Sequence, residues 1–316
     1  MIRNQRFLGS GHESDAYMID HDVYGENIVM KCFGGWNDGP TIWHNKQVFA
    51  KEKVSDIINA LPGRTYKIPK VFEIDKLNKY ETLAPGAPLT RELFDSLSKQ
   101  DQQDVLFAHA EFLHDIHHEI QEVSLEQYLS GRLNACAPVS FDDALVMMKE
   151  NLQITKSFEV FLECRAALSS YESAKTPAFV MSCNDYLKPE NVLYDLNSKT
   201  LSFFDLAQCV YSTIDNDMYK YKQQETSDRQ IFNGAECAQL LEIYNSMPQK
   251  NSGLGEPEDI RAHFDELSYV YEAFLRIIAD EGSHLPGRVD PIDFYQSHFA
   301  ISKSRIIKMR LNEKTY

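Results

Sequence analysis

The sequence predicts an α+β protein with two lobes, a small β-rich N-terminal lobe and a larger, mainly helical C-terminal lobe. In the first eighty or so residues, short segments rich in β-branched and aromatic residues alternate with clusters of turn-forming residues. Later stretches are long and carry apolar residues three and four positions apart, which is typical of amphipathic helices. The Pro- and Gly-containing segment 84–90 separates the two regions, so we expect lobes at 1–83 and 84–316.

Individual elements follow from the same patterns. In the N-terminal lobe, the helix at 44–61 has apolar residues at helical spacing and is followed by a Pro-Gly stop. In the C-terminal lobe we expect helices at 90–120 and 268–282 and a β-hairpin at 192–204. The strands expected in the N-terminal lobe are 6–11, 16–20, 27–33, 70–75 and 77–83.

The composition is that of an ordinary soluble globular protein. Of the 316 residues, 43% are hydrophobic and 25% are charged, which argues against disordered, collagen-like and membrane-spanning chains. No run approaches the ~18 apolar residues of a transmembrane helix, and the N-terminus lacks the apolar stretch of a signal peptide. We therefore expect a cytoplasmic protein with no membrane partner, present as a monomer or weak dimer.

The net charge bears on which kinds of partner are expected. A net charge of −15 argues against a nucleic-acid partner, because binding to a phosphate backbone is driven by clustered Lys and Arg. The same charge would attract a cationic substrate, and it fits equally an acidic surface that only aids solubility.

Six cysteines occur without a Cys-x-x-Cys pair or a Cys/His cluster, so we expect buried thiols in a reducing compartment rather than zinc ligands or disulfides.

A glycine-containing loop between the first two expected strands is a candidate phosphate-binding loop. Gly9, Ser10 and Gly11 lie there, followed by Ser14. Glycines let backbone N–H groups approach phosphate oxygens closely. Gly-x-Gly alone is more often a simple hairpin turn, and Ser14 stands where dinucleotide and kinase patterns have a third glycine.

Lys31 lies in an apolar strand, where an ammonium group is costly unless it faces a cleft and has an anionic partner. Glu52 stands among apolar positions of the expected helix 44–61, and we predict that it pairs with Lys31 and orients it toward the α- and β-phosphates of a nucleotide. The alternatives are a lysine that extends off the sheet edge and a solvated glutamate. At the following joint, the extended backbone of Glu81 and Leu83 could present a C=O and an N–H to an adenine edge, or it could be a plain linker.

The strongest signal is the segment 181–209, "MSCNDYLKPENVLYDLNSKTLSFFDLAQC". Asn191 precedes the first strand of the expected hairpin and Asp205 follows its second strand, so both side chains lie at the open end. Such a pair can hold Mg²⁺, which prefers oxygen ligands from one or two side chains together with substrate phosphates. Asp185, a few residues before the hairpin, is the candidate catalytic base. For Asn191 and Asp205, a purely structural role is the weaker alternative.

Taken together, this order of features resembles the protein-kinase-like bilobal fold, and most closely its aminoglycoside phosphotransferase and choline kinase branch, over residues 5 to 220. The segment "FLHDIHH" at 112–118 is similar to that family's Leu-x-x-Leu-His helix, and the Lys31 strand is similar to the Val-Ala-Ile-Lys strand of kinases. "DLAQC" at 205–209 stands where protein kinases carry Asp-Phe-Gly, and no long activation segment follows. The resemblance implies ATP, or alternatively GTP, and Mg²⁺ as cofactors.

The segment departs from the family pattern at two points. Cys183 stands in place of a supporting histidine, and six steps rather than five separate Asp185 from Asn191. If the segment is aligned without a gap, Tyr186 takes the position of the base. A phenol with an ordinary pKa of about 10 is a poor base at neutral pH, whereas a carboxylate can orient a hydroxyl and accept its proton. We therefore predict that a one-residue bulge brings Asp185 into register.

These observations predict an ATP- and Mg²⁺-dependent phosphotransferase that acts on a hydroxyl of a small molecule. The acceptor is open, with an aminoglycoside or another cationic amino-alcohol among the possibilities, because 213–232 and 256–274 contain acidic and aromatic residues that suit a cation. The alternative is that these segments are ordinary solvated helix faces. Nucleotidyl transfer, seen as AMP on the product, is a further possibility. A catalytically impaired, nucleotide-binding pseudokinase is the main alternative, and a protein kinase is a weaker one.

Overall fold

The computed structural model describes residues 2–11, 14–34, 40–123, 180–183, 186–212 and 230–248, together with positions 214, 221 and 250. The chain divides into two compact units, and every described residue except Val123 belongs to the first, Met1–Glu122 with Phe179–Leu254. The helix expected at 268–282 lies outside the described residues. The expected division into lobes at 83 and 84 stays a prediction.

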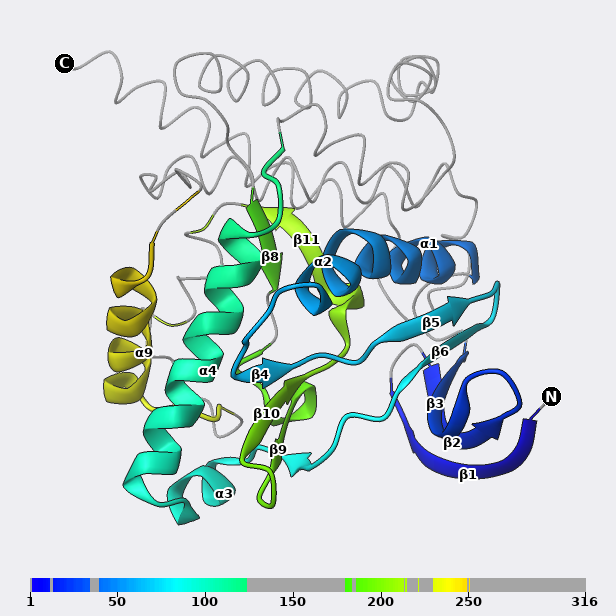
Figure 1. The fold of residues 1–316 in the computed structure, drawn as a ribbon, viewed down its shortest axis with the longest axis horizontal. Helices are drawn as coiled ribbons and strands as arrows, with labels where there is room; N and C mark the ends of the chain where they lie inside the picture. Colours follow the sequence, from blue (N-terminus) through cyan, green and yellow to red (C-terminus); the bar gives the residue numbers. More distant parts are fainter. Residues whose placement is uncertain are drawn as a thin grey trace, which may run out of the picture. The chain divides into compact units, whose positions relative to one another are not determined.

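An antiparallel five-stranded sheet forms the N-terminal part of this unit, with the strand order β1-β2-β3-β6-β5 (Figure 1). All five strands expected from the sequence are present. Lys31, on the central strand β3, lies opposite Ala16 of β2 and Lys79 of β6. The strands are β1 (Ile2–Ser10), β2 (Ser14–His21), β3 (Gly25–Phe33), β5 (Val71–Ile74) and β6 (Asn78–Thr82).

The helical segment that follows β3 begins earlier than expected. Helix α1 (Pro40–Ala50) continues through a π-helical turn (Lys51–Ser55) into α2 (Asp56–Asn59). Proline is well tolerated in the first turn of a helix, where its missing N–H has no intrahelical partner. Trp43 and Val54 are fully buried, so this segment presents its apolar side to the core.

A second sheet carries the predicted hairpin. Its strand order is β4-β10-β9-β7, with β4 parallel to β10 and the other pairs antiparallel. The hairpin is confirmed, with a turn between Asp195 and Thr200. A separate antiparallel pair is formed by β8 and β11. The strands are β4 (Tyr66–Lys67), β7 (Ala87–Pro88), β8 (Val180–Cys183), β9 (Val192–Asp195), β10 (Thr200–Phe203) and β11 (Cys209–Ser212).

The single helix expected at 90–120 is two helices, α3 (Arg91–Ser96) and α4 (Lys99–His118). The backbone of Leu97 and Ser98 is extended, which ends α3. The Ser98 side chain then accepts a hydrogen bond from the backbone N–H of Asp101, which caps α4. The apolar periodicity runs through both helices. Only the serine cap at the break marks the start of α4.

Helix α4 packs its apolar side on the second sheet through a cluster of aromatic rings. The rings of Phe112 on α4 and Phe203 on β10 are stacked, with centroids 3.8 Å apart and planes 8° from parallel. Tyr66 and Tyr186 meet Phe112 edge-on. This cluster anchors the base of the hairpin, since Phe203 is separated from Asp205 by a single residue.

Helix α9 (Gly234–Ser246) covers the other side of α4. His117 Nδ1 and His118 Nε2, both on α4, each lie 2.9 Å from the hydroxyl oxygen of Tyr244 on α9. His114 Nε2 lies 2.7 Å from the carbonyl oxygen of Pro248, just beyond α9. These buried polar contacts connect the C-terminal end of α4 with the segment around α9.

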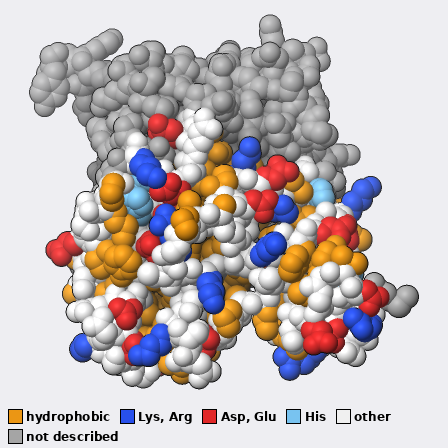
Figure 2. Space-filling model, in the orientation of Figure 1, with side chains coloured by type: hydrophobic (Ala, Val, Ile, Leu, Met, Phe, Trp, Pro, Cys, Tyr) orange, Lys and Arg blue, Asp and Glu red, His pale blue; other side chains and the backbone are white. Residues whose placement is uncertain are grey.

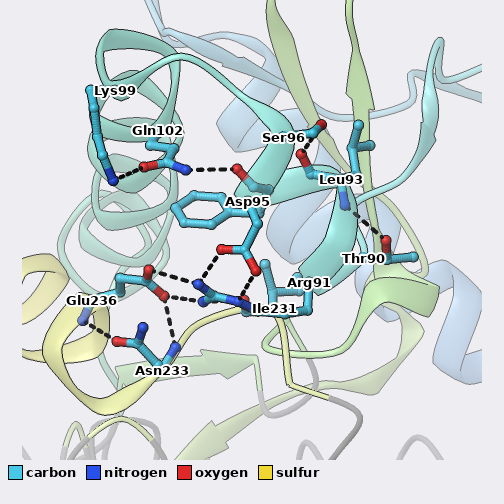
Figure 3. A network of polar contacts seen from close by, with 11 residues as sticks. Thr90, Arg91, Leu93, Asp95, Ser96, Lys99, Gln102, Ile231, Asn233 and Glu236 are labelled. Atoms are coloured by element: carbon cyan, nitrogen blue, oxygen red, sulfur yellow. Dashed lines mark hydrogen bonds and ion pairs between the residues drawn. The ribbon is translucent and has the colours of Figure 1, made fainter.

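A polar network centred on Arg91 joins α3 to the start of α9 (Figure 3). The guanidinium group of Arg91 pairs with Glu236 of α9 and with Asp95 one turn along α3, and it donates a 3.2 Å hydrogen bond to the carbonyl of Ile231. Glu236 also completes a capping box with Asn233 at the start of α9. One guanidinium therefore connects two helix N-termini.

Of the cysteines, two are free and one is disulfide-bonded among the described residues. Cys32 and Cys237 are free thiols, as expected. Cys209 is disulfide-bonded, which corrects the expectation of thiols only. In the backbone register of β8 and β11, residue 209 lies opposite residue 183, a juxtaposition that sequence spacing does not show.

Over the described part of the chain, none of the helices has both the length and the apolar character needed to cross a bilayer.

Gly86 makes the closest backbone approach of the segment that was expected to join the lobes. Its φ is +109°, and a Cβ atom at this position would lie 2.5 Å from the carbonyl carbon and oxygen of Tyr194. We expect Gly86→Ala to lower the free energy of unfolding by about 3 kcal/mol, because it adds backbone strain and displaces β9. Urea denaturation monitored by circular dichroism measures this change.

Gly9→Ala is the matched control, because a Cβ atom at Gly9 would meet nothing within 4 Å. Its free energy of unfolding should stay within about 0.5 kcal/mol of the wild type. Equal losses in the two variants would contradict the close approach at Gly86.

Candidate active site

Lys31 lies at the centre of the candidate site and is held by two carboxylates from distant parts of the chain. Its Nζ is 3.4 Å from Oε1 of Glu81 on β6 and 3.7 Å from Oδ1 of Asp205, which follows β10. The ammonium also lies 5.6 Å from the ring centroid of Phe204. Strand β3 and the end of the predicted hairpin thus meet at one partly buried cation.

Lys79 joins this group from β6. Its Nζ is 2.8 Å from Oε2 of Glu81, so the two oxygens of one carboxylate each face a different lysine. Lys79 and Glu81 are both buried, with 4% of each residue exposed. Lys79 is not among the site residues predicted from the sequence. The signal was available, because alternation along a strand puts residues 79 and 81 on the same face.

The charges in this group act on one another strongly. Burial works against the charged form of Lys31, but Glu81 and Asp205 outweigh it and raise the pKa of Lys31 to about 12. Burial likewise opposes the carboxylate of Glu81, yet the two lysines lower the pKa of Glu81 below its ordinary value. For Lys79 burial dominates, and its pKa is lowered despite the contact with Glu81.

The predicted pairing of Lys31 with Glu52 is corrected. Glu52 is exposed and lies in the π-helical turn 51–55, where the buried positions are Val54 and Ser55. The carboxylates that contact Lys31 among the described residues are those of Glu81 and Asp205. Glu52 therefore lies on the solvated side of its helix, which was the alternative left open by the sequence.

The place of Glu81 is also corrected. We expected its backbone at the joint, but Glu81 lies inside β6, where its backbone is paired in register with Val29 of β3 and Val71 of β5. Its side chain rather than its backbone therefore faces the site. Leu83 follows the end of β6 and is 43% exposed, and its role toward a nucleotide stays a prediction.

Asn191 and Asp205 lie at the open end of the hairpin, as its pattern predicted. Asn191 ends a short 3₁₀ turn before β9, and its carbonyl accepts a 3.2 Å hydrogen bond from the backbone N–H of Phe204. This bond places the backbone next to Asp205 beside Asn191. Asp205 has left-handed backbone angles, φ 63° and ψ 48°, which aspartate tolerates better than most residues. Its side chain is 39% exposed.

The residues of the glycine-containing loop lie at the connection between β1 and β2. Gly9 and Ser10 end β1, and the backbone N–H of Gly11 donates a 2.8 Å hydrogen bond to the carbonyl of Ser14 at the start of β2. The Ser10 hydroxyl donates to Asp15 across the same connection. Open space beside the backbone at Gly9 leaves room for a ligand.

Asp185 lies outside the described residues, but its neighbour Tyr186 is described. Tyr186 is 3% exposed, and its ring lies edge-on against Phe112 and Phe203, with centroids 4.9 and 5.5 Å away. Its phenol ring is therefore part of the hydrophobic core. The gapless alignment, which would make Tyr186 the base, does not fit this placement.

The acidic and aromatic segments proposed for a cationic acceptor also fall largely outside the described residues. All of 256–274 lies outside them, as does 213–232 except for positions 214, 221 and 230–232. On the face drawn in Figure 2, lysine and arginine side chains are interspersed with aspartate and glutamate across the described part of the chain. This face has no broad field of a single sign.

Comparison with known proteins gave matches among solved structures. Neither protein-family models nor curated proteins matched the chain. The ADP-bound aminoglycoside phosphotransferase APH(2'')-Ib aligns at 14% identity with a TM-score of 0.51, covering 95% of this chain and 92% of that one. The gentamicin complex of APH(2'')-IIa aligns at 16% identity and a TM-score of 0.51, covering 90% and 89%. The chain therefore has the protein-kinase-like fold of the aminoglycoside phosphotransferases, as the resemblance predicted.

Proposed function

We propose that this protein is an ATP- and Mg²⁺-dependent phosphotransferase that acts on a hydroxyl group of a small molecule. The observation that carries the proposal is the meeting of Lys31 with Asp205, from segments 174 positions apart, on a fold shared with aminoglycoside phosphotransferases. A buried lysine held beside carboxylates is available to a phosphate group that enters the same space. One of the similar structures is ADP-bound, which supports a nucleotide as donor.

Lys31 would contact the α- and β-phosphates, and the loop from Gly9 to Ser14 would cover them. The open space beside Gly9 fits this role, because a side chain there would occupy it. Leu83 would lie at the adenine edge. GTP in place of ATP is left to the experiment.

The donor set at the end of the hairpin fits a magnesium ion. Asp205 offers a carboxylate oxygen and Asn191 an amide oxygen, and their backbones are joined through Phe204. Within the described ranges, no group of three or more His, Cys, Asp or Glu side chains forms a metal cage. A bound Mg²⁺ would offset the negative charge of the phosphates, and it usually takes one or two protein ligands and completes its shell with water and phosphate oxygens.

Asp185 would act as the base. As the acceptor oxygen bonds to the γ-phosphorus and the bond to the β-phosphate oxygen breaks, the hydroxyl proton passes to the Asp185 carboxylate and ADP leaves. The burial of Tyr186 in the aromatic core supports this assignment, because it removes the competing phenol from the loop.

The acceptor that we propose is an aminoglycoside or another cationic amino-alcohol. The net charge of −15 is compatible with a cationic acceptor, and one of the similar structures was solved with gentamicin. We further propose a monomer or weak dimer located in the cytoplasm, with neither nucleic acid nor membrane as a partner.

The test is nucleotide turnover by the purified protein with ATP or GTP, with and without Mg²⁺, across aminoglycosides, choline-like amines and sugars. We expect Mg²⁺-dependent ADP release that at least one cationic acceptor stimulates severalfold, together with phosphate on that acceptor. AMP on the product would instead indicate nucleotidyl transfer. Nucleotide binding without turnover on any acceptor would favour a pseudokinase, and labelled phosphate on protein in a lysate would favour a protein kinase.

A further inference from the structure

Two lysines lie directly opposite each other in the five-stranded sheet. Lys31 of β3 and Lys79 of β6 are register partners in an antiparallel pair, so their side chains are on the same face. Like charges in this position repel each other. The pair is buried on a face where water screens little of that repulsion, since the two side chains are 12% and 5% exposed.

Glu81 compensates this repulsion by bridging the two ammonium groups. Its Oε2 is 2.8 Å from Lys79 and its Oε1 is 3.4 Å from Lys31, so the contact with Lys79 is the shorter one. Asp205 supplies a second carboxylate to Lys31, at 3.7 Å. The four side chains together carry no net charge, which offsets the cost of burying Lys79 and Glu81.

Binding of a nucleotide and a metal would change this balance of charges. The inference therefore rests on the proposed function. With a nucleotide and metal bound, Lys31 would contact the phosphates and Asp205 would hold the metal. Glu81 would then be a buried carboxylate deprived of Lys31, and removing one partner from a buried ion pair is strongly unfavourable. The short contact with Lys79 is the one that can remain.

We propose that Lys79 is a positioning residue of the phosphotransfer site, which keeps Glu81 paired so that Lys31 can pass from Glu81 to the phosphates. Lys79 acts through Glu81 and has no contact with the reacting atoms. Glu81 therefore holds Lys31 in the free protein without competing strongly for it when the nucleotide arrives.

The experiment is a mutant cycle on nucleotide binding, which needs no knowledge of the acceptor. Lys79→Met, Glu81→Gln and the double variant are titrated with ATP in the presence of Mg²⁺, and the free energy of unfolding is measured in parallel. We expect Lys79→Met to raise the Kd about tenfold, because Glu81 then competes with the phosphates for Lys31. Lys79→Arg, which keeps the charge, should stay within about threefold of the wild type.

The double variant gives the readout that a merely structural role would not produce. Adding Glu81→Gln to Lys79→Met removes the competing carboxylate, so the Kd should return to within about threefold of the wild type. Lys76→Met is the matched control, since Lys76 is an exposed lysine between β5 and β6 and its loss should leave the Kd unchanged. If Lys79→Met does not fold, Lys79→Gln removes the charge while its amide can still donate to Glu81, and the Kd should rise in the same direction.

The outcomes separate this inference from the proposed function. If the wild type binds Mg²⁺-ATP and Lys79→Met binds it equally well, the role of Lys79 is overturned and the proposed function stands. A weakened Lys79→Met that Glu81→Gln does not rescue also overturns it, because the loss would then be structural. If the wild type binds neither ATP nor GTP, both proposals fail.

Discussion

Asp205→Asn is expected to lower Mg²⁺-dependent nucleotide turnover by about a thousandfold, the loss typical when a charge-stabilising group is removed from an active site. The substitution keeps the size of the side chain but removes the negative charge that faces Lys31 at 3.7 Å and that would hold the metal. The measurement is kcat for ADP release over a Mg²⁺ titration. We expect the Mg²⁺ concentration for half-maximal activity to rise as well, which a change confined to folding would not cause.

Asp195→Asn is the matched control for this prediction. Asp195 lies at the other end of the same hairpin, where it accepts hydrogen bonds from the backbone of Asn197 and the hydroxyl of Ser198 in the turn. Its substitution removes the same charge from the same hairpin, and turnover should stay within about twofold of the wild type because the turn is remote from Lys31. Turnover by Asp205→Asn within tenfold of the wild type, with an unchanged Mg²⁺ concentration for half-maximal activity, would rule out the metal role of Asp205.

Asp185→Asn is expected to lower kcat by about a hundred- to ten-thousandfold, the range of a lost general base. The Kd for Mg²⁺-ATP should change by less than about threefold, since the proposed contacts of the nucleotide come from other residues. Rapid-quench measurement of the chemical step with the stimulating acceptor, beside a nucleotide titration, separates these two quantities.

Tyr186→Phe is the companion variant, because the gapless alignment makes Tyr186 the base. The structure buries the ring of Tyr186 against Phe112 and Phe203, so loss of its hydroxyl should leave kcat within about threefold of the wild type. If Tyr186→Phe lost turnover and Asp185→Asn kept it, the assignment would be reversed and the phenol would be the reacting group.

The sequence predicted the fold well where the residue pattern of a segment is typical of one kind of element, strand or helix. The five N-terminal strands and the hairpin at 192–204 are β-rich or apolar segments bounded by turn-forming residues, and all are present. The division of 90–120 into two helices was missed, because the apolar spacing continues across Ser98 and only the serine cap marks the start of α4. The local sequence pattern therefore predicted which elements are present better than it predicted the residues at which they begin and end.

The candidate site was predictable in its parts but not in their pairing. Lys31 stood out as a charge in an apolar strand, and Asp205 stood out at the end of a hairpin. The carboxylate that pairs with Lys31 depends on which strand lies beside β3 and in which register, and a single sequence contains no direct signal for that pairing. Glu52 was chosen from a helical period, yet a π-helical turn and the burial of Val54 place it on the exposed side.

The contacts between α4 and α9 have a consequence for synthesis of the chain on the ribosome. Arg91 and Glu236 are 145 residues apart, and Tyr244, which meets His117 and His118, is made later still. At about 5–20 residues per second, roughly seven to thirty seconds pass between the appearance of α3 and that of α9. Throughout that interval the nascent α4 has its histidine-bearing side without the tyrosine that later covers it, so the buried contacts of this side form only after residue 244 has been made.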